Sequence, residues 1–161
     1  RGLGDVYKRQ KIRFYENDAI SLGTLYSFET QIQRAISERV WMKSGAYLII
    51  QPTEALTVID VNSGKNTSGK NAEEYYYKIN LEAAAEISRQ LRLRNISGIV
   101  IVDFINMAKE EQRKELMHQF RLSLKEDPVP VRLVDITKLG LVELTRKKER
   151  KTLLEQVAQL R

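Results

Sequence analysis

The 161-residue sequence contains no cysteine, so the chain forms neither a disulfide bond nor a cysteine-ligated zinc site. No apolar run approaches the roughly 20 residues that a membrane-spanning helix needs. The first residues lack the apolar segment of a secretory signal. The single histidine, His118, has no histidine partner, which favours a structural or exposed position over catalysis. These absences agree with a cytoplasmic protein.

The composition is that of one globular domain. Apolar residues make up 42% of the chain and charged residues 30%, which excludes a disordered chain. The length is enough for a substantial hydrophobic core. The net charge of +6 favours a polyanionic partner, RNA or DNA, although such an excess also serves solubility alone. No internal repeat and no low-complexity tract is present.

The chain does not begin with methionine, and its first ten residues, RGLGDVYKRQ, show neither helical nor strand periodicity. We interpret Arg1–Gln10 as a non-native leader and exclude it from the fold. The missing methionine suggests a fragment of a longer protein.

Apolar periodicity predicts alternating strands and helices in the rest of the chain. The order β-β-α-β-α-β-β-α predicts an α/β fold, with a mixed sheet flanked by helices in two or three layers. Four consecutive apolar residues in SGIVIVDF indicate a central strand buried on both faces. The predicted helices are 24–40, 72–92, 109–126 and one near the C-terminus; the predicted strands are 46–51, 55–61, 97–104, 131–136 and 141–145.

The segment GKNTSGKN at 64–71 resembles a phosphate-binding loop of the G-x-x-x-x-G-K type. However, Asn71 occupies the position where a serine or threonine hydroxyl would bind Mg²⁺, and an amide suits that role poorly. Asn71 followed by Glu74 instead matches the start of a helix. A nucleotide-binding loop therefore remains an alternative with weaker support.

Two aspartates stand where apolar strands end. Asp60 follows LTVI and Asp103 follows IVIV. Ligands of open α/β sheets bind at the carboxyl ends of strands, so neighbouring strands would bring both carboxylates into one crevice. Two carboxylates in one site repel each other unless a cation lies between them, and Mg²⁺ is the simplest choice. The competing interpretation is that each aspartate caps a loop.

Asn62 lies two residues after Asp60 and would share its face of an extended strand. There its amide would orient the carboxylate or donate to a phosphate oxygen, although a turn asparagine fits equally well. Asp135 and Glu54 also lie near strand ends, and the sequence leaves their roles open. Tyrosines 75–77 either stack on bases or pack on neighbouring elements.

Three long segments resemble the catalytic domain of the ribonuclease E/G family. They are TEALTVIDVNSGK, NLEAAAEISRQLRLRNISGIVIVDFINM and DITKLGLVELTRK, at 53–65, 80–107 and 135–147. The resemblance implies a deoxyribonuclease I-like subdomain of an endoribonuclease that cuts single-stranded RNA in rRNA and tRNA processing and in mRNA decay. It also implies products with a 5′-phosphate and a 3′-hydroxyl, and a full-length homo-oligomer.

The family's magnesium-binding aspartates correspond to Asp60 and Asp103, and its adjacent asparagine to Asn62. The resemblance therefore makes these three the expected catalytic residues, with Mg²⁺ as the cofactor. We expect RNA-backbone contacts from Lys65, Lys138 and Arg146, the last at the start of a basic run. A non-catalytic RNA-binding module is the alternative from another functional class.

The resemblance also predicts a division of the chain. Residues 11–39 would end a preceding ribonuclease H-like subdomain, 40–155 would form the catalytic subdomain, and 156–161 would begin a linker toward a zinc-binding segment. The family's S1 domain and 5′-end sensor are not in this sequence. The zinc site also lies outside it, so we expect the fragment alone to be weakly active or inactive.

Overall fold

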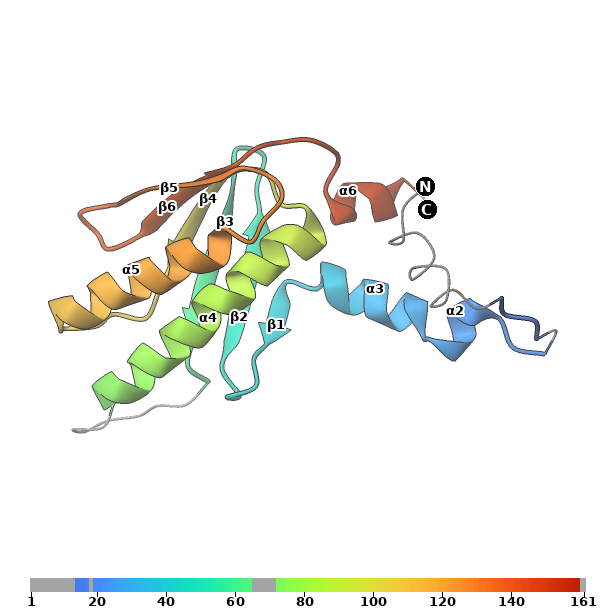
Figure 1. Cartoon of the computed structure of the whole chain (residues 1–161), viewed down its shortest axis with the longest axis horizontal. Helices are drawn as coiled ribbons and strands as arrows, with labels where there is room; N and C mark the ends of the chain where they lie inside the picture. The colour runs from blue at the N-terminus through green and yellow to red at the C-terminus, as the bar shows by residue number, and fades with distance from the viewer. Residues whose placement is uncertain (1–13, 18, 65–71, 160–161) are drawn as a thin grey trace, which may run out of the picture. The chain divides into compact units, whose positions relative to one another are not determined.

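The structure is a computed structural model that describes residues 14–17, 19–64 and 72–159 (Figure 1). The chain divides between Arg34 and Ala35 into two compact units. The buried hydrophobic residues of the described chain begin at Val40 and therefore all belong to the second unit. The assignment of the first unit to a ribonuclease H-like subdomain stays a prediction, and the leader 1–10 lies outside the described residues.

One predicted helix, 24–40, is instead two helices and a strand. Helix α2, Leu22–Leu25, begins after Ser21, whose Oγ accepts the backbone N–H of Thr24 at 3.1 Å. Helix α3 spans Phe28–Ile36, and Ser27 between the helices has a φ of 50°, which no helix accommodates. Val40 belongs to strand β1, where it pairs with Leu48. The helix predicted from apolar spacing is too long at its C-terminal end. There the chain enters a strand, because Val40 pairs with Leu48 of the next strand.

The second unit contains a six-stranded mixed sheet in the order β1-β2-β3-β4-β6-β5. Only β3 and β4 pair in parallel; β1 with β2, β2 with β3, β4 with β6 and β6 with β5 are antiparallel. The expected hairpin of the 46–51 and 55–61 segments is thus confirmed. The strands are β1 Arg39–Trp41, β2 Tyr47–Pro52, β3 Leu56–Asn62, β4 Gly98–Asp103, β5 Val131–Ile136 and β6 Val142–Arg146.

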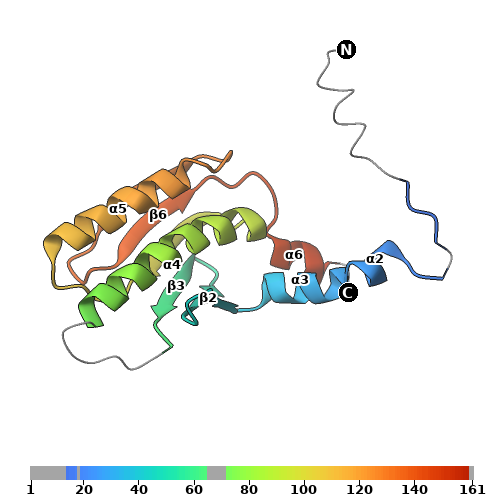
Figure 2. The ribbon, with the colours of Figure 1, turned by 60° about the horizontal axis from the view of Figure 1, so that its bottom comes forward.

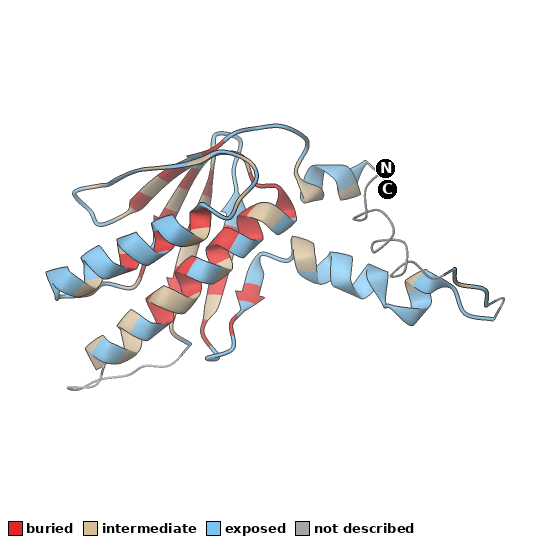
Figure 3. Cartoon of the chain, in the orientation of Figure 1, coloured by how far each residue is buried: buried red, intermediate tan, exposed pale blue. Residues whose placement is uncertain are grey.

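Two long helices, α4 (Ala72–Arg94) and α5 (Glu110–Leu124), lie side by side on one face of this sheet (Figure 2). A short helix, α6 (Leu153–Ala158), begins with a capping box between Thr152 and Glu155. Figure 3 shows buried positions recurring along α4. The stripe predicted for α4 is buried as expected: Ile79, Ala83, Ala84, Ile87 and Leu91. The buried residues of α5 are Leu116, Phe120 and Leu124.

Burial alternates along the central strands, so the helices cover one face only. In β3, Thr57, Ile59 and Val61 are buried, while the residues between them are half-buried. In β4, Val100 and Val102 are fully buried, but Ile99 is 48% exposed. The expectation that β4 is buried on both faces is wrong for this chain. We call the face turned away from α4 and α5 the open face.

Within the described residues, no helix is both long enough and apolar enough to cross a membrane.

Candidate active site

Asp60 and Asp103 are register partners in the parallel pair of β3 and β4. Their strand neighbours Ile59, Val61 and Val102 are buried beneath the helices, so both aspartates point to the open face. Adjacent strands lie about 4.8 Å apart, so the two aspartates are direct neighbours across this strand pair. The two strands are thus neighbours whose ends coincide, as the expectation of a shared crevice requires.

Asn62 is the third residue that the structure brings to this point. Its Nδ2 donates a hydrogen bond of 2.8 Å to Oδ2 of Asp60. This geometry requires both side chains on the same face of β3, as their spacing by two predicts. The hydrogen bond restricts the rotation of the Asp60 carboxylate and leaves Oδ1 outside this contact.

A buried asparagine on α4 holds the chain just after Asp103. Asn80 is fully buried, and its Oδ1 accepts the N–H of Ile105 at 3.0 Å. Its Nδ2 donates to the carbonyl of Ile105 at 2.7 Å. Both polar groups of one peptide segment are thus satisfied by one side chain. The sequence analysis missed this residue; the available signal is its place four residues before Ala84, within the buried stripe.

The donor set suits a hard divalent cation. It consists of two carboxylates, one half-buried at Asp60 and one exposed at Asp103. Among the described residues no third Asp, Glu or His joins them in one cluster. Mg²⁺ is commonly held by one or two carboxylates and keeps its other positions for water and phosphate oxygens. The arrangement fits that pattern.

The glycine-rich loop begins beside this site. Gly64 has a φ of +70°, and a Cβ built on it would lie 2.5 Å from the carbonyl oxygen of Gly45. A glycine is therefore needed for the close approach of two backbones at the carboxyl end of β3. Lys65 and Asn71, together with the rest of the phosphate-loop motif, lie outside the described residues, and their predicted roles stay predictions.

Two of the remaining acidic residues lie away from the pair. Asp135 pairs with Glu143, which in turn pairs with Ile101 of β4. Asp135 therefore lies two strands from β4, level with Ile101 and not with Asp103. Glu54 precedes β3 and lines a cavity of about 610 Å³ at the amino ends of β3 and β4. That cavity lies at the opposite end of the strands from the carboxylates.

The two other predicted RNA contacts differ in position. Lys138 is exposed in the turn between β5 and β6, which extends past Val142. Val142 pairs with Val102, so this turn is at the same end of the sheet as Asp103. Lys138 therefore remains a candidate for contact with a polyanion near the site.

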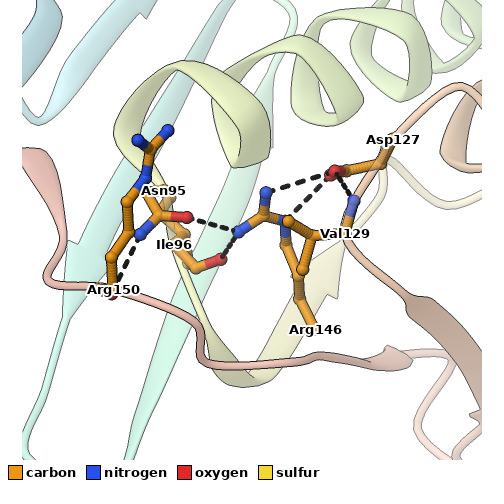
Figure 4. A network of polar contacts seen from close by, with 6 residues as sticks. All are labelled: Asn95, Ile96, Asp127, Val129, Arg146 and Arg150. Carbon is orange, nitrogen blue, oxygen red and sulfur yellow. Dashed lines mark hydrogen bonds and ion pairs between the residues drawn. The ribbon is translucent and has the colours of Figure 1, made fainter.

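Arg146 is a correction to the prediction, because it is buried and cannot contact RNA at the surface (Figure 4). Its Nε and Nη2 donate to the two carboxylate oxygens of Asp127 at 2.8 and 3.2 Å. Its Nη1 donates to Oδ1 of Asn95 and to the carbonyl of Ile96. Arg146 also pairs with Gly98, at the amino end of β4 and away from Asp103.

The contacts with Arg146 change the pKa of the Asp127 carboxyl group. Burial by itself raises the pKa of Asp127, but the hydrogen bonds from Arg146 and from the N–H of Val129 outweigh it. With the charges of Arg146 and Arg92, they hold the pKa of Asp127 below its ordinary value. This pair links the end of α5 to the sheet and belongs to the fold.

The remaining candidates have structural positions. His118 is exposed on α5. Tyr75 and Tyr77 pack against the core, and the Tyr75 hydroxyl donates to the carbonyl of Ser63 at 3.1 Å. These contacts favour packing over base stacking for Tyr75 and Tyr77.

Comparison with known proteins decides the family. The model of the ribonuclease E/G family matches residues 5–149. The chain belongs to the ribonuclease E/G family. The resemblance carried by the three sequence segments is thereby confirmed, and the α/β architecture agrees with it.

Curated members of the ribonuclease E/G family are similar over most of this chain. Ribonuclease G of Salmonella typhimurium is 44% identical over 128 residues, which cover 80% of this chain and 26% of the relative. Ribonuclease E of Synechocystis is 44% identical over 142 residues, which cover 88% of this chain and 21% of the relative. Ribonuclease E of Nostoc is 45% identical over 130 residues, which cover 81% of this chain and 19% of the relative. The chain thus spans about a quarter or less of these relatives.

Proposed function

We propose that this chain supplies the metal-binding carboxylates of an endoribonuclease that hydrolyses single-stranded RNA. The observation that carries the proposal is the register pairing of Asp60 with Asp103 on the open face. Two carboxylates one strand apart repel each other unless a cation lies between them. Membership in a ribonuclease family and the net charge of +6 support RNA as the substrate.

In this proposal Asp60 and Asp103 hold Mg²⁺ at the carboxyl ends of β3 and β4. When bound, Mg²⁺ supplies a Lewis acid for a phosphate oxygen and lowers the pKa of a bound water. Asn62 keeps the Asp60 carboxylate in one orientation through its 2.8 Å hydrogen bond. Water adds to phosphorus, the bond to the 3′-oxygen breaks and that oxygen takes up a proton. The products carry a 5′-phosphate and a 3′-hydroxyl.

The wider role proposed for the full-length protein rests on the resemblance of its sequence to the ribonuclease E/G family. It is the maturation of rRNA and tRNA and the decay of mRNA, by a homo-oligomer in the cytoplasm. The described chain contributes two carboxylates to this role, and the rest of the protein would contribute most of the RNA-binding affinity. The fragment by itself is expected to cut weakly or not at all.

Cleavage by variants of the full-length protein tests the proposal. We expect Asp60→Asn and Asp103→Asn each to lower the rate of cutting a labelled single-stranded RNA by about a hundredfold or more, because each removes a metal ligand. EDTA should abolish the wild-type activity, and Mg²⁺ should restore it. Glu54→Gln, the same change of carboxylate to amide at the other end of β3, should cut like the wild type.

The outcomes separate the alternatives. Undiminished cleavage by either aspartate variant rejects the two-carboxylate site. RNA binding without any cleavage by the wild type favours a non-catalytic RNA-binding module. ATP binding that disappears in Lys70→Ala supports the nucleotide-binding loop.

A further inference from the structure

An aromatic cluster with a cation lies on the open face of β1 and β2, the two strands beyond the one that carries Asp60. Trp41 is 63% exposed, a large value for a tryptophan within a strand. Its ring centroid lies 5.0 Å from that of Tyr47, with the planes tilted by 58°. The guanidinium of Arg39 lies 4.7 Å from the Tyr47 centroid and 5.6 Å from that of Trp41. We call Arg39, Trp41 and Tyr47 the aromatic platform.

Strand register connects this platform to the candidate site. Arg39 pairs with Ile49, Ile49 with Asp60, and Asp60 with Asp103, so these residues form one row across the open face. In the next row, Trp41 pairs with Tyr47 and Tyr47 with Asn62. Tyr47 is thus one strand from Asn62. Trp41 is two strands from it, or about 10 Å at the usual strand spacing.

The two faces of β1 differ in their surroundings. Val40, between Arg39 and Trp41, is 8% exposed and contributes to the core under the helices. Trp41 on the other face buries little of its ring. A single exposed aromatic residue is ordinary, but this one is next to a second ring and a guanidinium at the edge of a phosphodiester-cleaving site. Those are the components that single-stranded nucleic-acid sites combine.

We propose that the aromatic platform stacks one unpaired nucleobase of the RNA whose scissile phosphate lies at Asp60 and Asp103. This inference rests on the proposed function. The exposed face of Trp41 takes the base, because every base has a π-face and an indole offers the largest complementary one. Arg39 keeps the rings in place through its cation–π contacts and adds positive charge beside the backbone. A duplex offers no such base, so the platform selects single strands.

Binding measurements on the full-length protein test the platform separately from catalysis. The probe is a fluorescein-labelled single-stranded oligoribonucleotide, followed by anisotropy in EDTA. We expect Trp41→Ala to weaken binding by about tenfold, since stacking on one aromatic side chain is commonly worth a factor of this order. Trp41→Phe should recover most of the affinity. Ile99→Ala, an exposed apolar residue at the other end of the open face, should bind like the wild type.

A series of oligoribonucleotides that each lack one base, an abasic scan, distinguishes stacking on Trp41 from a non-specific loss of RNA affinity. In the wild type, removal of the base at one position near the cleavage site should lower RNA affinity about as much as Trp41→Ala does. In Trp41→Ala, the same removal should lower the affinity no further. Binding of the matching duplex should not change. In Mg²⁺, Trp41→Ala should raise KM by about tenfold with kcat within about twofold.

Several results overturn the platform while leaving the carboxylate site intact. They are unchanged affinity of Trp41→Ala, additive losses in the abasic scan, and an equal loss for duplex RNA. A change in oligomeric mass with unchanged RNA affinity would assign the surface to a protein partner instead. If Asp60→Asn cuts normally, the proposed function fails, whatever Trp41→Ala does.

Discussion

At the residue scale, the ion pair of Asp127 and Arg146 shows how burial changes the role of a charge. Their side chains are 1% and 3% exposed, and every nitrogen of the guanidinium donates to an acceptor. Removing one partner of such a pair leaves a buried charge, which typically costs about 3–5 kcal/mol. Arg146 therefore stabilises the junction of α5, β4 and β6.

The lowered pKa of Asp127 predicts a pH dependence of stability. Because the folded state holds Asp127 ionised below its ordinary pKa, its contribution is fully present above about pH 4. It is lost as the pH falls from that value through the folded pKa. We expect Asp127→Asn to lower the free energy of unfolding by about 3 kcal/mol between pH 5 and 8. The difference from the wild type should shrink below pH 4.

Urea denaturation at a series of pH values measures this difference. Asp135→Asn is the matched control, since Asp135 is exposed and its carboxylate accepts only a neighbouring backbone N–H. A difference between Asp127→Asn and the wild type that stays constant down to pH 2 would contradict the linkage.

At the element scale, α4 both covers the sheet and positions the end of β4. Asn80 binds both polar groups of Ile105, two residues beyond Asp103. The helix that buries Ile79 and Ala83 thus also determines where the strand carrying Asp103 ends. This contact holds the chain two residues beyond Asp103, while the β3–β4 ladder aligns Asp103 with Asp60.

Replacing Asn80 should impair catalysis more than folding alone explains. We expect Asn80→Ala to lower kcat of the full-length protein by about tenfold or more, because small displacements of catalytic groups have large effects. Mg²⁺ affinity, measured by titration calorimetry, should fall in parallel. Ser88→Ala is the control: Ser88 is equally buried on α4 but bonds only to its own helix. Equal activities of the two variants, at equal folded fraction, would reject a positioning role.

At the scale of the whole molecule, the sheet and its two long helices form a hydrophobic core to which no described residue before Val40 contributes. The first compact unit, up to Arg34, contributes no buried residue among those described. The two carboxylates therefore belong to a unit with its own hydrophobic core.

Removal of residues 1–34 should leave that core intact. We expect a chain of residues 35–161 to unfold cooperatively, with a midpoint within about 4 °C of the longer chain, a shift that corresponds to roughly 1 kcal/mol or less. Calorimetry or circular dichroism measures it. A comparison chain that lacks only residues 1–10 tests whether these residues contribute to stability. Loss of the cooperative transition on removing 1–34 would show that the first unit supports the sheet.

Local patterns in the sequence determined much of this description. The 3.6-residue spacing in α4 and α5, the apolar strands and the aspartates at their ends were all readable, because each depends on residues close together in the chain. Long collinear segments also identified the family. The end of α3 was misjudged because Val40 satisfies a helical pattern while its strand partner is distant.

Only the tertiary structure decided which residues meet. Asp60 and Asp103 are register partners because β3 and β4 pair in parallel across a 23-residue helix. Both long helices pack on one face, which leaves Ile99 exposed and Trp41 on the same open face as the carboxylates. Arg146 is buried because Asp127 and Asn95, far away in sequence, surround it. Register and burial depend on contacts between distant segments, and no local pattern specifies them.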